Sequence, residues 1–184
     1  MIDTDALLRK YTEGNACLYR ILTGHSGAVR DLALRIARGM GGGVDMQFVE
    51  EASMLHDIGV ARVDAPSICC FGPEPYIRHG VEGRAILDAE GLPRHAFVCE
   101  RHTGSGLSVK QIMGQNLPLP HRDMIPLSTE ERLICYADKF FSKSRDLRAA
   151  KPVEKIMAQM QAHGQEAYAR FLSMHAEFGS FLPF

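Results

Sequence analysis

Hydrophobic residues recur along most of the chain at the three- and four-residue spacing of amphipathic helices. Glycine and proline clusters separate the segments that carry this pattern. The pattern predicts helices over residues 3–12, 16–23, 29–40, 46–61, 79–90, 94–102, 108–114, 128–146, 152–163 and 164–178. The second and third are either separate or one helix bent at Gly24 and Gly27. No stretch alternates for long enough to predict a strand, so the expected fold class is all-α, a helical bundle.

Three connecting or terminal features complete the predicted layout. Residues 62–77 contain Pro66, Pro73 and Pro75, which predicts a loop and a candidate wall of a site. Ser128 followed by Glu131 is typical of a capping box at a helix start. The segments over 152–178 are expected to pack on the rest of the chain, so residues 1–184 are read as one domain.

The composition is typical of a packed protein and excludes some classes of partner. The 184 residues are 46% hydrophobic and 23% charged, which argues against disorder. The net charge is -1, so no basic field favours long nucleic acid as a substrate. No apolar run approaches the length of a membrane span and no signal-peptide pattern opens the chain, so we expect a cytoplasmic protein without a membrane partner. The five cysteines are an odd number without a CxxC pair, which predicts reduced thiols.

Several ionisable side chains fall on helix faces that are otherwise hydrophobic. His25 precedes Val29 by four positions, and Asp138 follows Ile134 by four, so both point inward. The full set is His25, His56, Asp57, His79, His102 and Asp138. Burying carboxylates costs several kcal/mol, about the amount that a shared cation would offset. Imidazole and carboxylate ligands suit Fe, Mn, Co, Ni or Zn, so the sequence predicts a divalent transition-metal site.

These residues also carry a family resemblance. His25, the doublet His56-Asp57 inside Leu-His-Asp-Ile-Gly, and Asp138 inside Tyr-Ala-Asp-Lys resemble the H…HD…D signature of the HD superfamily of metal-dependent phosphohydrolases. The resemblance spans residues 24–143. The segments around His79 and His102 are similar to those of the subgroup that holds two metals.

The resemblance implies that the chain binds one or two metals and indicates which residues are the ligands. One metal would be held by His25, His56, Asp57 and Asp138. A second would be held by His79 and His102, with Asp57 as a bridge. The segments depart from the two-metal relatives at Gly80 and Thr103, where those relatives often have a proline and a second histidine or acid.

The expected reaction follows from these ligands. A metal-activated hydroxide would cleave a phosphomonoester or phosphodiester, in a nucleotide or another small phosphorylated metabolite. Asp57 and Lys139 are the candidate catalytic residues. The candidates for holding the substrate phosphate are Lys139, Arg78, Arg84 and Arg101.

Three alternatives stay open at this point. In a single-metal 5′-nucleotidase, His79 and His102 would bind substrate instead of metal. In a sensor or scaffold, the metal would stabilise a protein without turnover. Oxygenase chemistry at a mixed-valent di-iron centre is the third. A homodimer is compatible with each of them.

Overall fold

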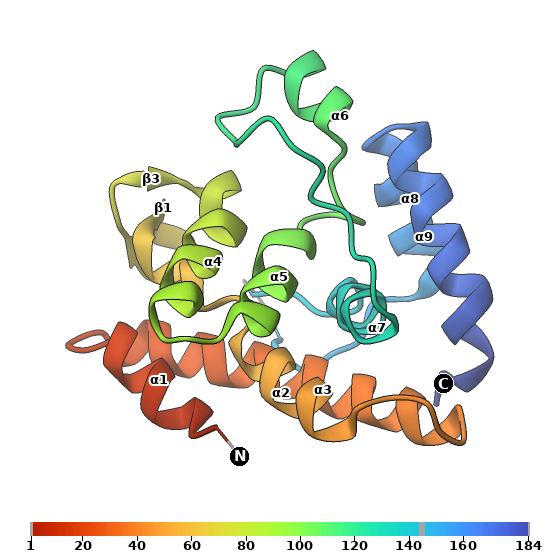
Figure 1. The fold of residues 1–184 in the computed structure, drawn as a ribbon, viewed down its shortest axis with the longest axis horizontal. Coiled ribbons are helices and arrows are strands. Elements are labelled where there is room, and N and C mark those ends of the chain that lie inside the picture. The colour runs from red at the N-terminus through yellow and green to blue at the C-terminus, as the bar shows by residue number, and fades with distance from the viewer. Residues whose placement is uncertain (1, 144–145, 184) are drawn as a thin grey trace.

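The computed structural model describes residues 2–143 and 146–183, and most of them are helical. Figure 1 shows the long helix α2 along the base, with α8 and α9 on the side opposite α1 and the small sheet. The all-α prediction is confirmed. The helices are α1 (Thr4–Tyr11), α2 (Ala16–Gly39), α3 (Met46–Leu55), α4 (His79–Ala89), α5 (Pro93–Arg101), α6 (Val109–Gly114), α7 (Thr129–Asp138), α8 (Val153–Ala162) and α9 (Gln165–Phe178).

Polar N-cap side chains determine where the first two helices begin. The Asp3 carboxylate accepts from the Ala6 backbone N–H and opens α1, and the Asn15 side chain does the same for α2 through Leu18. The two segments predicted on either side of Gly24 form the single helix α2. Gly24 has a packing role there, because an added Cβ would lie 2.7 Å from the Leu147 side chain.

Two helices are shorter than the pattern predicted. The helix predicted over 46–61 ends at Leu55, and the chain turns through His56 and Asp57 into a 3-10 helix, η1 (Ile58–Arg62). The helix predicted to reach residue 146 ends at Asp138. Residues 144 and 145 of that prediction lie outside the described residues. In both cases the apolar periodicity continues beyond the helix because the following turn is buried as well.

Only half of the predicted capping box forms at α7. The Ser128 hydroxyl accepts from the Glu131 backbone N–H at 3.1 Å. The Glu131 carboxylate accepts from the Leu127 backbone N–H at 2.8 Å, one residue before the reciprocal partner that the motif predicts.

The segment over 62–77, predicted as a loop, folds into a small sheet. Its strands are β1 (Val63–Ala65), β2 (Cys70–Phe71) and β3 (Glu74–Pro75), in the order β2-β1-β3. β1 is antiparallel to β2 and parallel to β3. Strands of two or three residues are too short to show alternation, which is why the sequence pattern missed them.

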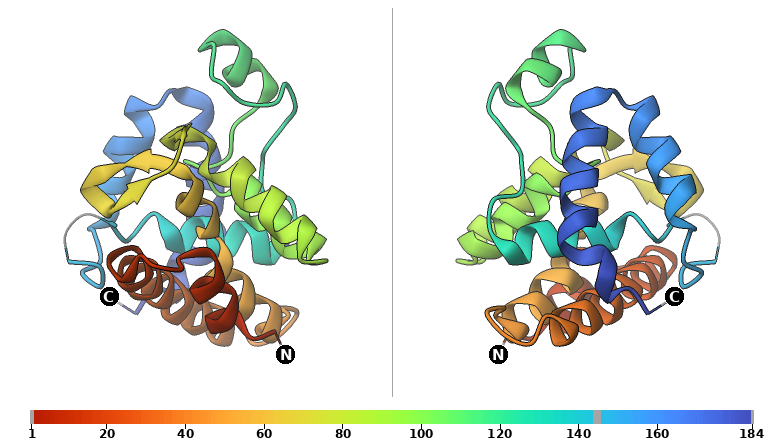
Figure 2. Two further views of the ribbon diagram at one scale, coloured as in Figure 1. Left: turned by 90° about the vertical axis from the view of Figure 1, so that its left-hand side faces the viewer. Right: turned by 90° about the vertical axis from the view of Figure 1, so that its right-hand side faces the viewer.

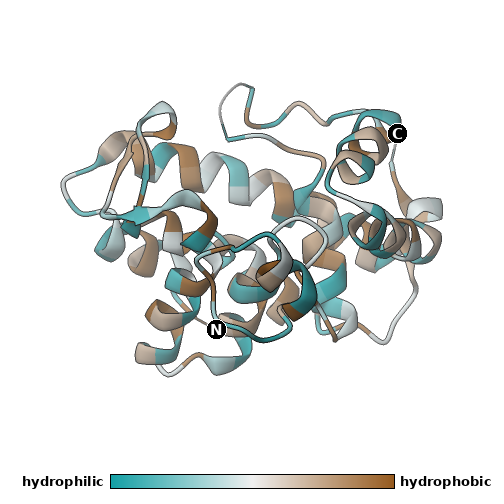
Figure 3. Cartoon of the chain, turned by 90° about the horizontal axis from the view of Figure 1, so that it is seen from above, coloured by the Kyte–Doolittle hydropathy of each residue, from teal (hydrophilic) through white to brown (hydrophobic). Residues whose placement is uncertain are grey.

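Two large hydrophobic cores hold most of the helices together, and a small third cluster of Ile112, Leu119 and Met124 packs around α6. The larger joins α2, α3 and α7 to the C-terminal pair, which contributes Ile156, Met160, Phe171 and Phe178. The smaller joins α1, η1 and the sheet to α4 and α5. Figure 2 shows α8 and α9 against one flank of the bundle, and Figure 3 shows hydrophobic and hydrophilic residues alternating along single helices, as expected where one face is buried.

The cysteine prediction is wrong in one respect. Cys17 and Cys69 form a disulfide that ties the start of α2 to the sheet segment, with Cα atoms 6.1 Å apart. Cys70, Cys99 and Cys135 are free and buried, as expected. The sequence did not indicate this pair, because the partners are 52 positions apart and the sheet segment was predicted as a loop.

Membrane insertion through a helix finds no support in the fold. None of the helices within residues 2–143 and 146–183 combines the length and the apolar character needed to cross a bilayer.

Candidate metal centre

The six predicted side chains converge from separate elements. Their ligand atoms form two groups that share Asp57, each with its atoms within 4.8 Å of one another. Helix ends supply most of them. His25 lies inside α2, His56 and Asp57 follow α3, His79 begins α4, His102 follows α5 and Asp138 ends α7.

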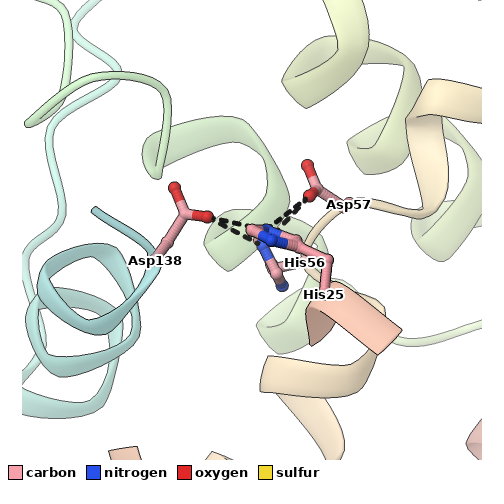
Figure 4. Close-up of side chains that lie close together, drawn as sticks. All are labelled: His25, His56, Asp57 and Asp138. Atoms are coloured by element: carbon pink, nitrogen blue, oxygen red, sulfur yellow. Dashed lines mark hydrogen bonds and ion pairs between the residues drawn. The ribbon is translucent and has the colours of Figure 1, made fainter. Parts of the chain in front are cut away.

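The first group contains two histidines and two carboxylates. His25 Nε2 lies 2.9 Å from Asp138 Oδ1 and 3.3 Å from Asp57 Oδ2. His56 Nε2 lies 3.2 Å from Asp57 Oδ2 and 3.5 Å from Asp138 Oδ1. Figure 4 shows the two imidazoles between the two carboxylates. All four side chains are at least nine-tenths buried.

The second group meets the other oxygen of the shared carboxylate. His102 Nε2 lies 3.3 Å from Asp57 Oδ1, and His79 Nε2 lies 3.8 Å from the same atom. The two Nε2 atoms are 3.2 Å apart. Asp57 therefore directs Oδ2 at one group and Oδ1 at the other.

Backbone carbonyls fix how His79 and His102 are oriented. His79 Nδ1 donates to the Tyr76 carbonyl and His102 Nδ1 to the Cys99 carbonyl, both at 2.8 Å. Burial lowers the pKa of His79 to about 3 and also lowers that of His102, so both rings are neutral at pH 7. Their Nε2 lone pairs then face each other. A cation between them would relieve that repulsion, and a carbonyl bond at the other nitrogen is typical of metal-bound histidine.

The two carboxylates of the first group also favour a cation beside them. Burial opposes a proton on His56, yet Asp57 and Asp138 raise the pKa of this side chain to about 9. Among the described residues, His56 Nε2 and Asp57 Oδ1 make no hydrogen bond of good geometry. Buried polar atoms without partners are costly. The residues of both groups therefore fit divalent transition metals, because imidazole nitrogens and carboxylate oxygens converge within 4.8 Å of one another in each group.

Two glycines allow the second group to reach the first. A Cβ on Gly59 in η1 would lie 2.0 Å from the His79 carbonyl oxygen, and one on Gly80 in α4 would lie 2.7 Å from the Cys99 carbonyl oxygen. Only glycine permits backbones to approach this closely. η1, α4 and α5 stack on one another as a result, and this places His79 and His102 beside Asp57. Gly80, which departs from the two-metal relatives, thus has a packing role in this chain.

Two lysines, Lys139 buried and Lys143 partly buried, bind the carboxylates of the centre. Lys139 Nζ lies 2.8 Å from Asp138 Oδ2 and donates to the His102 carbonyl at 3.0 Å. Lys143 Nζ lies 2.7 Å from Asp57 Oδ2. Burial alone would raise the pKa of both carboxyls. The charges and hydrogen bonds around them, led by Lys143 for Asp57 and by Lys139 for Asp138 and joined by the neighbouring histidines, together outweigh burial and hold each pKa well below its usual range.

Lys143 was not among the predicted site residues. It follows Asp138 by five positions, beyond the end of α7, so helical periodicity gave no direction for its side chain. Its Nζ also donates to the Tyr76 hydroxyl at 3.2 Å, and the Tyr76 ring stacks on His79. This lysine therefore contacts the shared carboxylate and the tyrosine that packs on the second group.

Lys143→Gln is expected to tighten Mn²⁺ binding about tenfold, because the substitution removes a cation that competes for Asp57 Oδ2. Isothermal titration calorimetry on the metal-free protein measures this. Lys110→Gln is the matched control, since Lys110 is highly exposed and pairs with Glu166. Unchanged or weaker Mn²⁺ binding by Lys143→Gln would show that the lysine does not compete with the metal.

The three candidate arginines are engaged elsewhere. Arg78 pairs with Glu74 at 2.7 Å and with Glu82 at 3.0 Å. Arg84 pairs with Glu100, and Arg101 pairs with Glu131 at 2.9 Å. None of the three lines the cavity at the metal centre. Each of the three thus has a carboxylate partner, and their binding of phosphate stays a prediction.

A cavity of about 510 Å³ opens beside the first group. His25, Asp138 and Lys139 line it from the side of the metal centre, and Ser67 and Ile68 line it from the sheet segment. The remaining wall comes from residues that the sequence analysis did not select. They include Lys143, Lys151, Gln159, Met160 and His163, whereas Tyr76 belongs to the segment over 62–77 that was expected to form a wall.

Comparison with known proteins identifies relatives of this centre. A family model described as HD domain matches residues 22–142. An uncharacterized protein of Methanocaldococcus jannaschii, MJ0778, is 28% identical over 146 residues, which cover 77% of this chain and 78% of that protein. No solved structure matches the chain.

Two further relatives are longer proteins. Each is named tRNA (cytidine(56)-2'-O)-methyltransferase. The one from Thermoplasma volcanium is 29% identical over 134 residues, and the one from Picrophilus torridus is 28% identical over 137. The matches cover 72% and 74% of this chain but only 35% and 36% of the relatives, so the chain spans about a third of their length.

Proposed function

The chain belongs to the HD domain family of metal-dependent phosphohydrolases, and we propose that it cleaves a phosphomonoester or phosphodiester of a nucleotide or another small phosphorylated metabolite. The observation that carries this proposal is the placement of Asp57, with one carboxylate oxygen toward each of two histidine-containing groups. A shared carboxylate between two ligand sets is suited to a pair of metals acting on one phosphate.

The residues of the two groups have separate roles in this proposal. His25, His56 and Asp138 would hold one metal and His79 and His102 the second, with Asp57 common to both. Divalent metals bound there would supply Lewis acidity and a nucleophile at neutral pH. The second group offers three protein ligands, which leaves room for substrate or water.

The protein's own residues fix the ligands and the substrate. Lys139 holds Asp138 through Oδ2 and leaves Oδ1 facing the histidines. We therefore assign Lys139 a positioning role, in place of direct phosphate binding. Lys143 lines the cavity and lies beside Asp57, so its ammonium group would be placed to donate to a phosphoryl oxygen of a substrate in the cavity.

Hydrolysis of phosphoesters by the Mn²⁺- or Co²⁺-loaded protein tests the proposal. Release of phosphate or nitrophenol from nucleotides, 4-nitrophenyl phosphate or bis(4-nitrophenyl) phosphate is the expected result. If the metal stays bound and none of these compounds is turned over, the chain is a metal-bound sensor or scaffold instead.

The number of metal equivalents per chain distinguishes a two-metal site from a single-metal site. Untagged protein loaded with Mn²⁺ and desalted is expected to hold about two equivalents by elemental analysis, and His79→Ala about one, because that histidine contacts only the second group. His121→Ala is the control, since His121 is exposed in a loop and should leave the content unchanged. One equivalent in the wild type would favour a single-metal 5′-nucleotidase in which His79 and His102 bind substrate.

A further inference from the structure

The cavity beside the metal centre has a wall that the family match does not cover. The match ends at residue 142, whereas Lys143, Lys151, Gln159, Met160 and His163 follow it. Residues of the sheet segment and of α8 line this same cavity. About 510 Å³ is within the range of small-molecule sites, so the cavity has room for a leaving group as well as a phosphate.

Positive charge dominates this cavity. Its lining contains Lys139, Lys143 and Lys151 and a single carboxylate, Asp138. Lys139 pairs with Asp138, and Lys143 pairs with Asp57 below the surface of the cavity. Across the described parts of the chain, no carboxylate forms an ion pair with Lys151, so this cation alone is free to bind a ligand.

Lys151 is also held in place. Its backbone N–H donates to the Phe140 carbonyl at 2.8 Å, which anchors it beside the end of α7. The residue is half-buried, and burial lowers its pKa, with a smaller opposing effect from Asp138 and further lowering by Lys139, Lys155 and Lys143. A half-buried ammonium group among other cations binds an anion more favourably than an exposed lysine does.

Other residues of this wall are suited to the uncharged part of a ligand. Met160 offers an apolar surface, and Gln159 and His163 offer hydrogen-bonding groups at the exposed rim. These three side chains lie on α8 and at its C-terminal end. The wall thus combines one cation with a mixed surface, the combination expected for a ligand with a distant negative group.

We propose that the substrate carries a second anionic group, a phosphate or a carboxylate, and that Lys151 binds it while the scissile phosphate lies at the metal centre. The inference rests on the proposed function and narrows its substrate class to phosphoesters whose leaving group is itself an anion. Lys151 is then the residue that distinguishes these compounds from simple monoesters.

Binding of non-hydrolysable compounds tests this without turnover. Calorimetry on the Mn²⁺-loaded protein compares benzylphosphonic acid with p-xylylenediphosphonic acid, which adds a second anion across the ring. We expect the diphosphonate to bind about tenfold more tightly to the wild type, an effect of one charged hydrogen bond. Lys151→Met should remove that preference, and Lys155→Met, a variant of an exposed lysine on α8, should keep it.

Hydrolysis of a matched set of phosphate esters then tests the hydrolase proposal and the second-anion inference separately. Phenyl phosphate is compared with its 4-phosphonomethyl, 4-phosphonoethyl and 4-carboxymethyl derivatives, whose added groups are not cleaved. Higher kcat/KM for a phosphonate or for the carboxylate identifies the second anion. Turnover of phenyl phosphate with no preference for any second anion would overturn this inference and leave the hydrolase proposal standing. A binding preference that depends on Lys151, found without turnover of any compound, would support this inference and contradict the hydrolase proposal.

Discussion

Asp57→Asn is expected to lower kcat/KM for phosphoester hydrolysis on the order of 10³-fold and to release metal from both groups. Asp57 is fully buried and is the one residue common to the two groups. The amide keeps the shape of the side chain but removes the negative charge and one of the two acceptor oxygens. Loss of metal stabilisation worth several kcal/mol corresponds to a rate loss of about this size. Steady-state kinetics and elemental analysis of the same preparation measure both effects.

Two further variants make this expectation specific. Asp138→Asn should release metal from the first group and leave the second occupied, because Asp138 belongs only to the first group. Asp64→Asn is the control, since Asp64 is exposed on β1 and contacts neither group. If Asp57→Asn kept two equivalents of metal and wild-type kcat/KM, Asp57 would not be the shared ligand.

The sequence was informative about these ligands because each lies on an inward helix face or at a helix end. His25 repeats with the apolar residues of α2, and Asp138 with those of α7, so the pattern predicts their direction without knowledge of the fold. The structure brings all six predicted side chains together. Element boundaries were less predictable. The turn at His56-Asp57 is as buried as the helix before it, so hydrophobicity does not mark where α3 ends.

The substrate side of the site was largely beyond sequence reasoning. Arg84 and Arg101 neighbour metal-group segments in the sequence, but pair with Glu100 and Glu131, which lie on other turns or helices. Lys143 and Lys151 follow a helix end, where the chain has no regular period. Which cation is neutralised and which is free depends on tertiary contacts. Those contacts, unlike a helix face, leave no repeat in the sequence.

The second histidine group depends on close backbone packing, and Gly59→Ala is expected to disrupt it. The added Cβ would meet the His79 carbonyl oxygen at 2.0 Å and the Gly83 backbone nitrogen at 2.2 Å, so η1 and α4 must separate. Overpacking against backbone is expected to cost at least about 3 kcal/mol and to lower Tm by roughly 6–12 °C. Because His79 moves with α4, the second metal equivalent should be lost while the first is kept. Thermal denaturation with chelator, followed by elemental analysis after Mn²⁺ loading, measures both.

The same substitution at Gly27 distinguishes close packing from a general effect of replacing glycine. Gly27 lies inside α2, and a Cβ there would meet nothing within 4 Å beyond the helix's own backbone. Gly27→Ala is therefore expected to raise stability by up to about 1 kcal/mol through helix propensity. Opposite signs at the two positions would show that glycine at position 59 serves the approach of α4 to η1. If Gly59→Ala instead matched the wild type in Tm and bound two metals, the second group would not depend on that approach.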